Sequence, residues 1–93
     1  MCPQSFATAY RSTVVDLRAA FGRAVRLKRV ELDLSQEALA DKAKMGRAFL
    51  SGVERGKVKV SIDSIESLAG ALGCQPSDLF VEAQRLMDKE VPG

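Results

Sequence analysis

Cap and stop residues in the central part of the sequence constrain the fold most, because they divide the chain into short helices. Ser35 and Ser61 are good helix N-caps, and each precedes a run with apolar residues at helical spacing. Gly56 and Gly73 suit the position just after a helix, where the backbone dihedral φ is positive. Pro76 suits the first turn of a further helix. These signals predict helices over residues 36–43, 47–55 and 62–72, and from residue 76 onward.

A first helix precedes these four, and its start has two interpretations. Apolar residues at steps of three and four would form one stripe if residues 5–31 were continuously helical. This stripe consists of Phe6, Tyr10, Val14, Leu17, Phe21 and Val25. The alternative is a helix that begins at Thr13, because Thr13 and Asp16 have the spacing of a capping box. We therefore divide the chain into an N-terminal arm or helix extension (1–15), a helical domain (16–88) and a frayed C-terminus (89–93).

Strand signals are nearly absent from the sequence. It contains no hairpin turn dipeptide, and only residues 58–60 alternate apolar and polar side chains, over too short a stretch to form a sheet. The predicted fold class is therefore all-α, with five short helices around one core. The expected core side chains of the last four helices are Leu39, Ala40, Ala43, Leu50, Val53, Ile62, Ile65, Leu68, Ala69, Leu72, Leu79, Phe80, Ala83, Leu86 and Met87.

Composition argues against an enzyme and against a metal site. The 93 residues suffice for one domain and include no histidine, the commonest general base and metal ligand. Cys2 and Cys74 lie too far apart for a zinc-ligand cluster, and we favour a buried, reduced Cys74 over a disulfide between them. No apolar run approaches the roughly 18 residues of a membrane span, and no signal-peptide pattern is present. We expect a cytoplasmic, non-enzymatic protein without a cofactor.

Charge is unevenly distributed, although the net charge is only +2. Residues 42–59 carry six basic side chains against one acid, Glu54, whereas residues 60–93 carry six acids against two basic side chains. A basic stripe of this kind is typical of a surface that binds the phosphate backbone of nucleic acid. It also fits an ordinary solvated face, so the charge needs support from a motif.

Residues 35–56 have the layout of a helix-turn-helix unit, with two short helices on either side of a tight turn. In such a unit the first helix props the second at an angle that lets it enter a DNA major groove about 12 Å wide. The turn and packing positions must be small or apolar. Here they are Ala40, Met45, Leu50 and Val53.

Three segments of the sequence closely resemble the XRE family of Cro and phage-repressor type regulators. They are residues 34–40 (LSQEALA), 50–56 (LSGVERG) and 68–73 (LAGALG), and the resemblance covers about residues 17–80. It implies a five-helix, lambda-repressor-like domain that binds double-stranded operator DNA, usually as a homodimer. The implied function is that of a sequence-specific transcriptional regulator, a repressor or autoregulator, acting on a palindromic operator.

The resemblance also assigns roles to individual residues. The base-reading positions are Arg47, Ala48, Ser51 and Gly52. The positions at the DNA backbone are Gln36, Gly46, Arg55, Lys57 and Lys59, and their contacts position the protein rather than specify sequence. Gln36 is also expected to brace the recognition helix with its side-chain amide. Arg29 and Glu54 match a buried ion pair that joins the first helix to the end of the recognition helix.

Four positions depart from the family pattern. Asp33 and Lys44 replace glycines that are frequent in the two turns, and Asp tolerates a positive φ better than Lys does. Gly46 stands where Ser or Thr commonly caps the recognition helix. Gly52 lacks a side chain at a base-reading position, so we expect specificity to depend on Arg47 and on DNA shape.

The sequence leaves alternatives open beside a stand-alone repressor. The same fold serves antitoxins, in which residues 1–13 would bind a small toxin protein, and restriction–modification controllers. A protein-binding module with vestigial DNA contacts is a third interpretation. For the homodimer, the last helix is the candidate interface, because its apolar stripe exceeds what a small core needs. The stripe consists of Leu79, Ala83, Leu86 and Met87.

Overall fold

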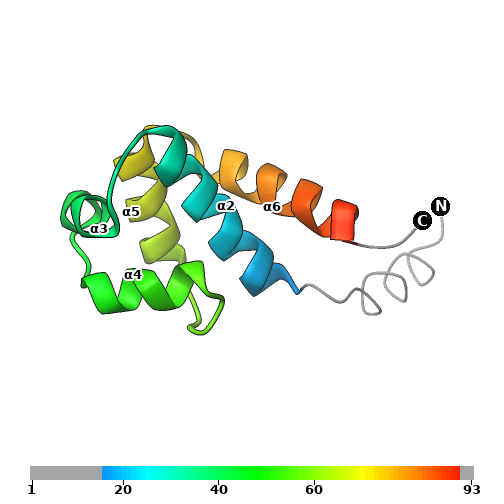
Figure 1. Cartoon of the computed structure of the whole chain (residues 1–93), viewed down its shortest axis with the longest axis horizontal. Helices are drawn as coiled ribbons and strands as arrows, with labels where there is room; N and C mark the ends of the chain where they lie inside the picture. Colours follow the sequence, from blue (N-terminus) through cyan, green and yellow to red (C-terminus); the bar gives the residue numbers. More distant parts are fainter. Residues whose placement is uncertain (1–15, 91–93) are drawn as a thin grey trace.

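The computed structural model describes residues 16–90, which form five α-helices and no strand (Figure 1). The helices are α2 (Leu17–Glu31), α3 (Gln36–Ala43), α4 (Arg47–Glu54), α5 (Ile62–Leu72) and α6 (Pro76–Glu90). The predicted all-α class is confirmed over these residues. None of the described helices is both long enough and apolar enough to cross a membrane.

The helix α2 begins at neither of the two predicted positions. Asp16 is its N-cap, with an extended backbone (φ −82°, ψ 170°), and its carboxylate accepts a hydrogen bond from the Ala19 N–H at 2.9 Å. Both predicted starts require helical dihedrals at Asp16, and both are therefore wrong. The carboxylate satisfies an N–H that the helix itself leaves without a partner, which favours the observed start. Outside the described residues lie the predictions for Cys2, Phe6, Tyr10, Thr13, Val14 and the toxin-binding arm.

Local signals set the ends of α3 and α5, as predicted. The Ser35 hydroxyl accepts a hydrogen bond from the Ala38 N–H at 3.0 Å, and the Ser61 hydroxyl accepts one from the Ser64 N–H at 3.1 Å. Each serine thus satisfies an N–H in the first turn of its helix. Gly73 ends α5 with φ 71°, a conformation that glycine adopts without a steric penalty.

The two turns that lack a glycine keep their left-handed backbone. Asp33, between α2 and α3, has φ 60°, and Lys44, between α3 and α4, has φ 57°. The turn geometry of the helix-turn-helix unit is therefore retained in spite of both replacements. For Lys44 this conformation carries a steric cost of roughly 1 kcal/mol, because its Cβ approaches the following carbonyl oxygen.

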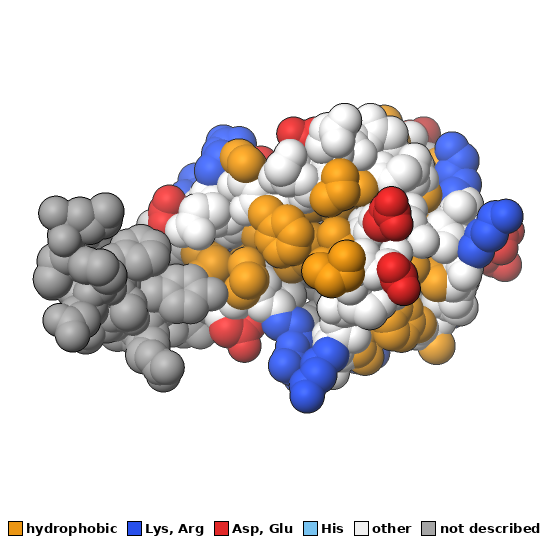
Figure 2. All heavy atoms as spheres, turned by 180° about the vertical axis from the view of Figure 1, so that it is seen from behind, with side chains coloured by type: hydrophobic (Ala, Val, Ile, Leu, Met, Phe, Trp, Pro, Cys, Tyr) orange, Lys and Arg blue, Asp and Glu red, His pale blue; other side chains and the backbone are white. Residues whose placement is uncertain are grey.

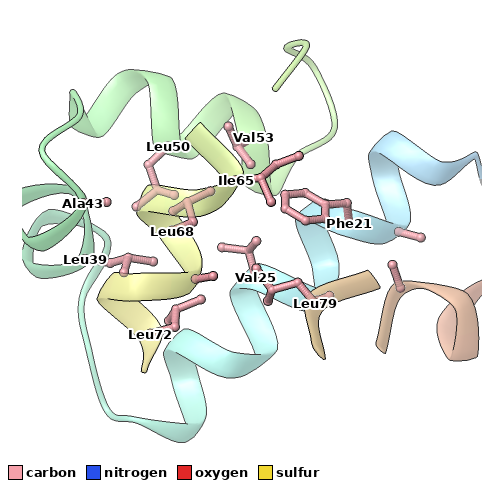
Figure 3. Close-up of a cluster of buried hydrophobic side chains, with 14 of the residues drawn as sticks. Phe21, Val25, Leu39, Ala43, Leu50, Val53, Ile65, Leu68, Leu72 and Leu79 are labelled. Atoms are coloured by element: carbon pink, nitrogen blue, oxygen red, sulfur yellow. The ribbon is translucent and has the colours of Figure 1, made fainter. Parts of the chain in front are cut away.

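One core connects all five described helices (Figure 3). The helix α2 packs along α6 and crosses α4, while α3 packs against α4 and α5. The helices α2 and α4 approach each other closely at Gly22, where an added Cβ atom would collide with the carbonyl oxygen of Val53. The largest fully buried side chains are Val25, Leu39, Leu50, Val53, Leu68, Leu79 and Met87.

The apolar stripe of α6 belongs to the core of the chain itself. Its residues Leu79, Ala83, Leu86 and Met87 are all buried. They are buried because α6 packs along α2, so they present no surface to a second copy. Their assignment as a dimer interface is wrong. Phe80, beside the stripe, is partly exposed, and its ring centroid lies 5.3 Å from that of Phe21.

One expectation near a helix end is also corrected. Ile62, expected in the core, is 78% exposed, because it is the first residue of α5 and the buried side of that helix begins at Ile65. Of the predicted frayed C-terminus (89–93), the structure describes residues 89 and 90, which are the last two of α6.

Cys74 lies just after α5, has a free thiol and packs, partly buried, against the core. Burial raises the pKa of this thiol above its ordinary value, and the positive charge of Lys28 offsets the rise only in part. The thiol is therefore protonated at neutral pH, and Cys74 serves as a small apolar side chain.

Candidate nucleic-acid interface

The helix α4 exposes one side over its first half, whereas its last three residues are buried. At 3.6 residues per turn, positions 47, 48 and 51 fall on the outer side. Arg47 and Ala48 are exposed there, and Ser51 is partly buried. On the inner side Leu50 and Val53 belong to the core. Three of the four predicted base-reading residues therefore lie together on an outward-facing surface that begins with an arginine.

A buried ion pair joins the end of α4 to α2, as the resemblance implied. Arg29 Nε donates to Glu54 Oε2 at 2.7 Å, and Arg29 Nη2 donates to Glu54 Oε1 at 3.1 Å. The remaining guanidinium nitrogen, Nη1, donates to the Leu34 carbonyl at 2.8 Å, and Gln36 Nε2 donates to Glu54 Oε1 at 3.0 Å. Glu54 is only 7% exposed. A buried carboxylate with three charge-assisted or amide donors fixes α4 relative to α2 and α3.

Gly52 does not face outward, so its assignment as a base-reading residue is wrong. It is buried and is turned toward the segment that follows α4. A Cβ atom at this position would lie 2.8 Å from Cγ1 of Val58, well inside normal van der Waals contact. The glycine therefore allows Val58 to pack directly on the backbone of α4.

The segment that follows α4, residues 57–60, alternates between inward and outward side chains. Val58 and Val60 pack against the core, whereas Lys57 and Lys59 are exposed. The sequence shows this alternation of apolar and polar side chains over residues 58–60, which is too short to form a sheet. The alternation correctly indicates which side chains pack against the core, although no strand forms here. Val58 is the residue that the sequence analysis missed.

Basic side chains flank the outer side of α4 at both of its ends. Lys44 and Arg47 are exposed at its start, and Arg55, Lys57 and Lys59 are exposed at and after its end. Arg55 Nε donates to the Ser51 carbonyl at 3.3 Å, so this side chain folds back along the helix. The surface thus combines a narrow outward-facing helix with positive charge on either side, an arrangement suited to a polyanion.

An open groove of about 280 Å³ lies between α2, α5, α6 and the segment after α4. Figure 2, seen from behind, shows hydrophobic side chains gathered across the middle of this side of the molecule. Ile62 adds a further exposed apolar side chain at the start of α5. The residues that line the groove are Leu17, Arg18, Phe21, Lys59, Val60, Ile65 and Phe80.

The helix-turn-helix family matches residues 25–79 of this chain, which include the whole of α3, α4 and α5. The control protein C.BamHI of Bacillus amyloliquefaciens is 43% identical over 66 residues, covering 70% of this chain and 82% of that protein. The crystal structure of the restriction-modification controller protein C.AhdI from Aeromonas hydrophila is also similar. It has 41% identity and a TM-score of 0.65, and the match covers 66% of this chain and 92% of that chain.

The clp gene regulator ClgR from Corynebacterium glutamicum has a similar structure as well. Its TM-score is 0.74 at 34% identity, and the match covers 76% of this chain and 91% of that chain. Sequence and structure therefore agree on one family.

Proposed function

The chain belongs to the XRE-type helix-turn-helix family of DNA-binding regulators, and on that premise we propose that it binds a two-fold symmetric operator as a homodimer. The observation that supports this most directly is the way α4 is held. Its outer side carries Arg47, Ala48 and Ser51, while its inner side is fixed by core contacts and by the Arg29–Glu54 ion pair. A helix held in this way is ready to enter a groove, so little ordering free energy is spent on binding.

We assign base readout to the outer side of α4. Arg47 pairs with the O6 and N7 atoms of guanine, Ala48 contacts a thymine methyl group, and Ser51 donates or accepts one hydrogen bond. Since Gly52 is turned away, three side chains read bases instead of four. Sequence-dependent DNA shape supplies the remaining discrimination.

We assign the phosphate contacts to the basic residues around α4 and to two helix starts. Arg55, Lys57 and Lys59 contact phosphates, and these contacts set the register of the protein on the duplex. The backbone N–H groups of Gln36 and Gly46 lie at the starts of α3 and α4, where the helix dipole favours an anion.

We assign the groove beside the 57–60 segment to a second copy of the chain. One short recognition helix binds weakly, whereas a dimer places two of them about 34 Å apart, on successive turns of one face of DNA. Five of the seven residues that line the groove are apolar, so it offers a mostly apolar surface to the second copy. Exposed apolar side chains at Ile62 and Phe80 supply area for the contact.

Selection of binding sites from random duplexes, repeated at several salt concentrations, tests the DNA contacts. Arg47→Ala should relax the preference at one base pair per half-site by about 1–3 kcal/mol. Lys57→Ala should weaken binding to all sequences alike and lower the slope of log K against log salt by about one unit. Lys89→Ala is the matched control, because it removes the same charge from an exposed position on α6. Equal, sequence-independent losses from Arg47→Ala and Lys57→Ala would contradict the assigned roles.

Sedimentation equilibrium tests the dimer. Ile62→Glu should give a monomer that keeps its half-site preference but loses tight binding to the full operator, since a carboxylate is costly to bury in an apolar contact. The side chain is 78% exposed, so the variant should fold. Val30→Glu is the matched control, because Val30 is another exposed apolar residue and lies away from the groove. A stable dimer of Ile62→Glu would exclude this interface.

The similarity to C.BamHI and C.AhdI favours a more specific role as the controller of a restriction–modification system. In that role the selected operator should occur beside genes for a restriction endonuclease and a methyltransferase. A reporter driven from that operator, with and without the protein, gives the sign of regulation. An operator remote from such genes would favour a stand-alone repressor.

A further inference from the structure

We infer that Gly52 is a positioning residue for the phosphate contacts: it sets where Lys57 and Lys59 stand relative to the base-reading side of α4. By this inference Gly52 contributes to DNA affinity without facing DNA. The inference rests on the proposed function for the role of the two lysines. The placement of the segment that carries them rests on the structure alone.

The first observation is the way the chain leaves α4. The Lys57 N–H donates to the Gly52 carbonyl at 2.8 Å, and the Gly56 N–H donates to the Val53 carbonyl at 3.0 Å. With Gly56 at φ 70°, these two bonds form a Schellman motif, which fixes the direction of the backbone after the helix. The carbonyl group of Gly52 thus accepts a hydrogen bond from the backbone of Lys57, the first of the two lysines.

The second observation is the contact between Gly52 and Val58. A Cβ atom at position 52 would lie 2.8 Å from Val58 Cγ1 and 3.6 Å from its Cγ2. Valine is branched at Cβ and has few low-energy rotamers, so its side chain cannot simply fold away. Val58 therefore needs bare backbone at position 52 in order to lie where it does.

A third observation shows that the turn has little freedom to move in the opposite direction. A Cβ atom at Gly56 would lie 2.8 Å from Cα of Ala19, so the turn is pressed against α2. Held between α2 and α4, the segment places Val58 and Val60 inward. The same alternation turns Lys57 and Lys59 outward. A larger residue at position 52 must displace the Val58 side chain. By this inference the backbone on either side of Val58, which carries the two lysines, moves with it.

Gly52→Ala tests this inference, with Gly70→Ala as the matched control. Both glycines lie inside helices, but nothing lies within 4 Å of a Cβ atom at Gly70. Gly70→Ala should raise the midpoint of thermal unfolding and leave DNA binding unchanged. Gly52→Ala should stay folded, lower the salt slope by about one to two units and keep the base preference read by Arg47. An unchanged salt slope for Gly52→Ala would overturn the inference.

The double variant Gly52→Ala/Val58→Ala keeps the test valid if the single variant is unstable. With the valine methyl groups removed, the alanine Cβ has room, so the salt slope should return most of the way to that of the original protein. A double variant that binds as weakly as Gly52→Ala would show that the Val58 contact is not the cause, and would overturn the inference. Amide NMR shifts of Lys57 and Lys59 should move in Gly52→Ala and recover in the double variant.

Failure of the proposed function would look different. In that case Lys57→Ala would leave the salt slope of the original protein unchanged, while the amide shifts would still respond to Gly52→Ala. If Lys57→Ala lowers the slope and Gly52→Ala does not, the proposed function stands and the positioning role falls.

Discussion

The two ends of α4 are held in opposite ways. At its start, the N-cap Gly46 makes no side-chain hydrogen bond, and Arg47 and Ala48 are exposed. At its end, Val53 and Glu54 are buried, Glu54 bonds to two other helices, and the Schellman motif closes the last turn. One short helix thus combines an end that is fixed in the core with a start that is open to solvent. The buried end holds α4 in place, and the exposed start leaves its side chains accessible from solvent.

Glu54→Ala should have the largest effect, because it removes the ion pair that fixes the end of α4. Arg29 would lose its carboxylate partner in a mostly buried position, and we expect a loss of about 3–5 kcal/mol in the free energy of unfolding. Urea unfolding followed by circular dichroism measures it. Glu82→Ala, which breaks the exposed Arg85–Glu82 pair, should cost less than about 1 kcal/mol. Similar losses from both variants would mean that burial adds nothing to the Arg29–Glu54 pair.

Gly22→Ala should disturb the packing of α2 against the same end of α4. The new methyl group would meet the carbonyl oxygens of Val53 and Glu54, so the two helices must separate. We expect a loss of about 1–3 kcal/mol in unfolding free energy, as for other overpacked sites. Gly70→Ala is again the control and should be neutral or stabilising. A stabilised Gly22→Ala would show that the crossing of α2 and α4 is looser than its geometry indicates.

Gly46→Ser should have the smallest effect on stability, since it only adds a side-chain cap at the start of α4, which has none. Open space surrounds the position, and a serine hydroxyl there can accept a hydrogen bond from the first turn of α4. We expect a gain of a few tenths of a kcal/mol in urea unfolding, because glycine is already a tolerated N-cap. A loss of stability would indicate that the start of α4 is constrained by more than its cap.

The parts of the fold that could be predicted from sequence are those with local signals. Ser35, Ser61 and Gly73 act on backbone groups within a few residues, so the ends of their helices follow from the sequence nearby. The start of α2 was mispredicted because Asp16 is compatible both with an N-cap and with a first turn, and sequence spacing does not separate the two.

The parts that could not be predicted depend on which surfaces meet. The stripe that contains Leu79 and Met87 would look the same facing a partner or facing α2, and only packing distinguishes the two. Whether position 52 faces solvent or is covered depends on where Val58 lies after the turn. The Arg29–Glu54 pair joins residues 25 positions apart, so the family resemblance suggested it and no local pattern could have.

The residues that donate hydrogen bonds to the Glu54 carboxylate, Arg29 and Gln36, lie on α2 and α3 and not on the exposed side of α4. Substitutions at positions 47, 48 and 51 should therefore leave these hydrogen bonds in place. A library randomised at these three sites should consist mostly of folded members, each with its own DNA preference. If the proposed function holds, substitutions at these positions should change the DNA target while the free energy of unfolding stays nearly constant.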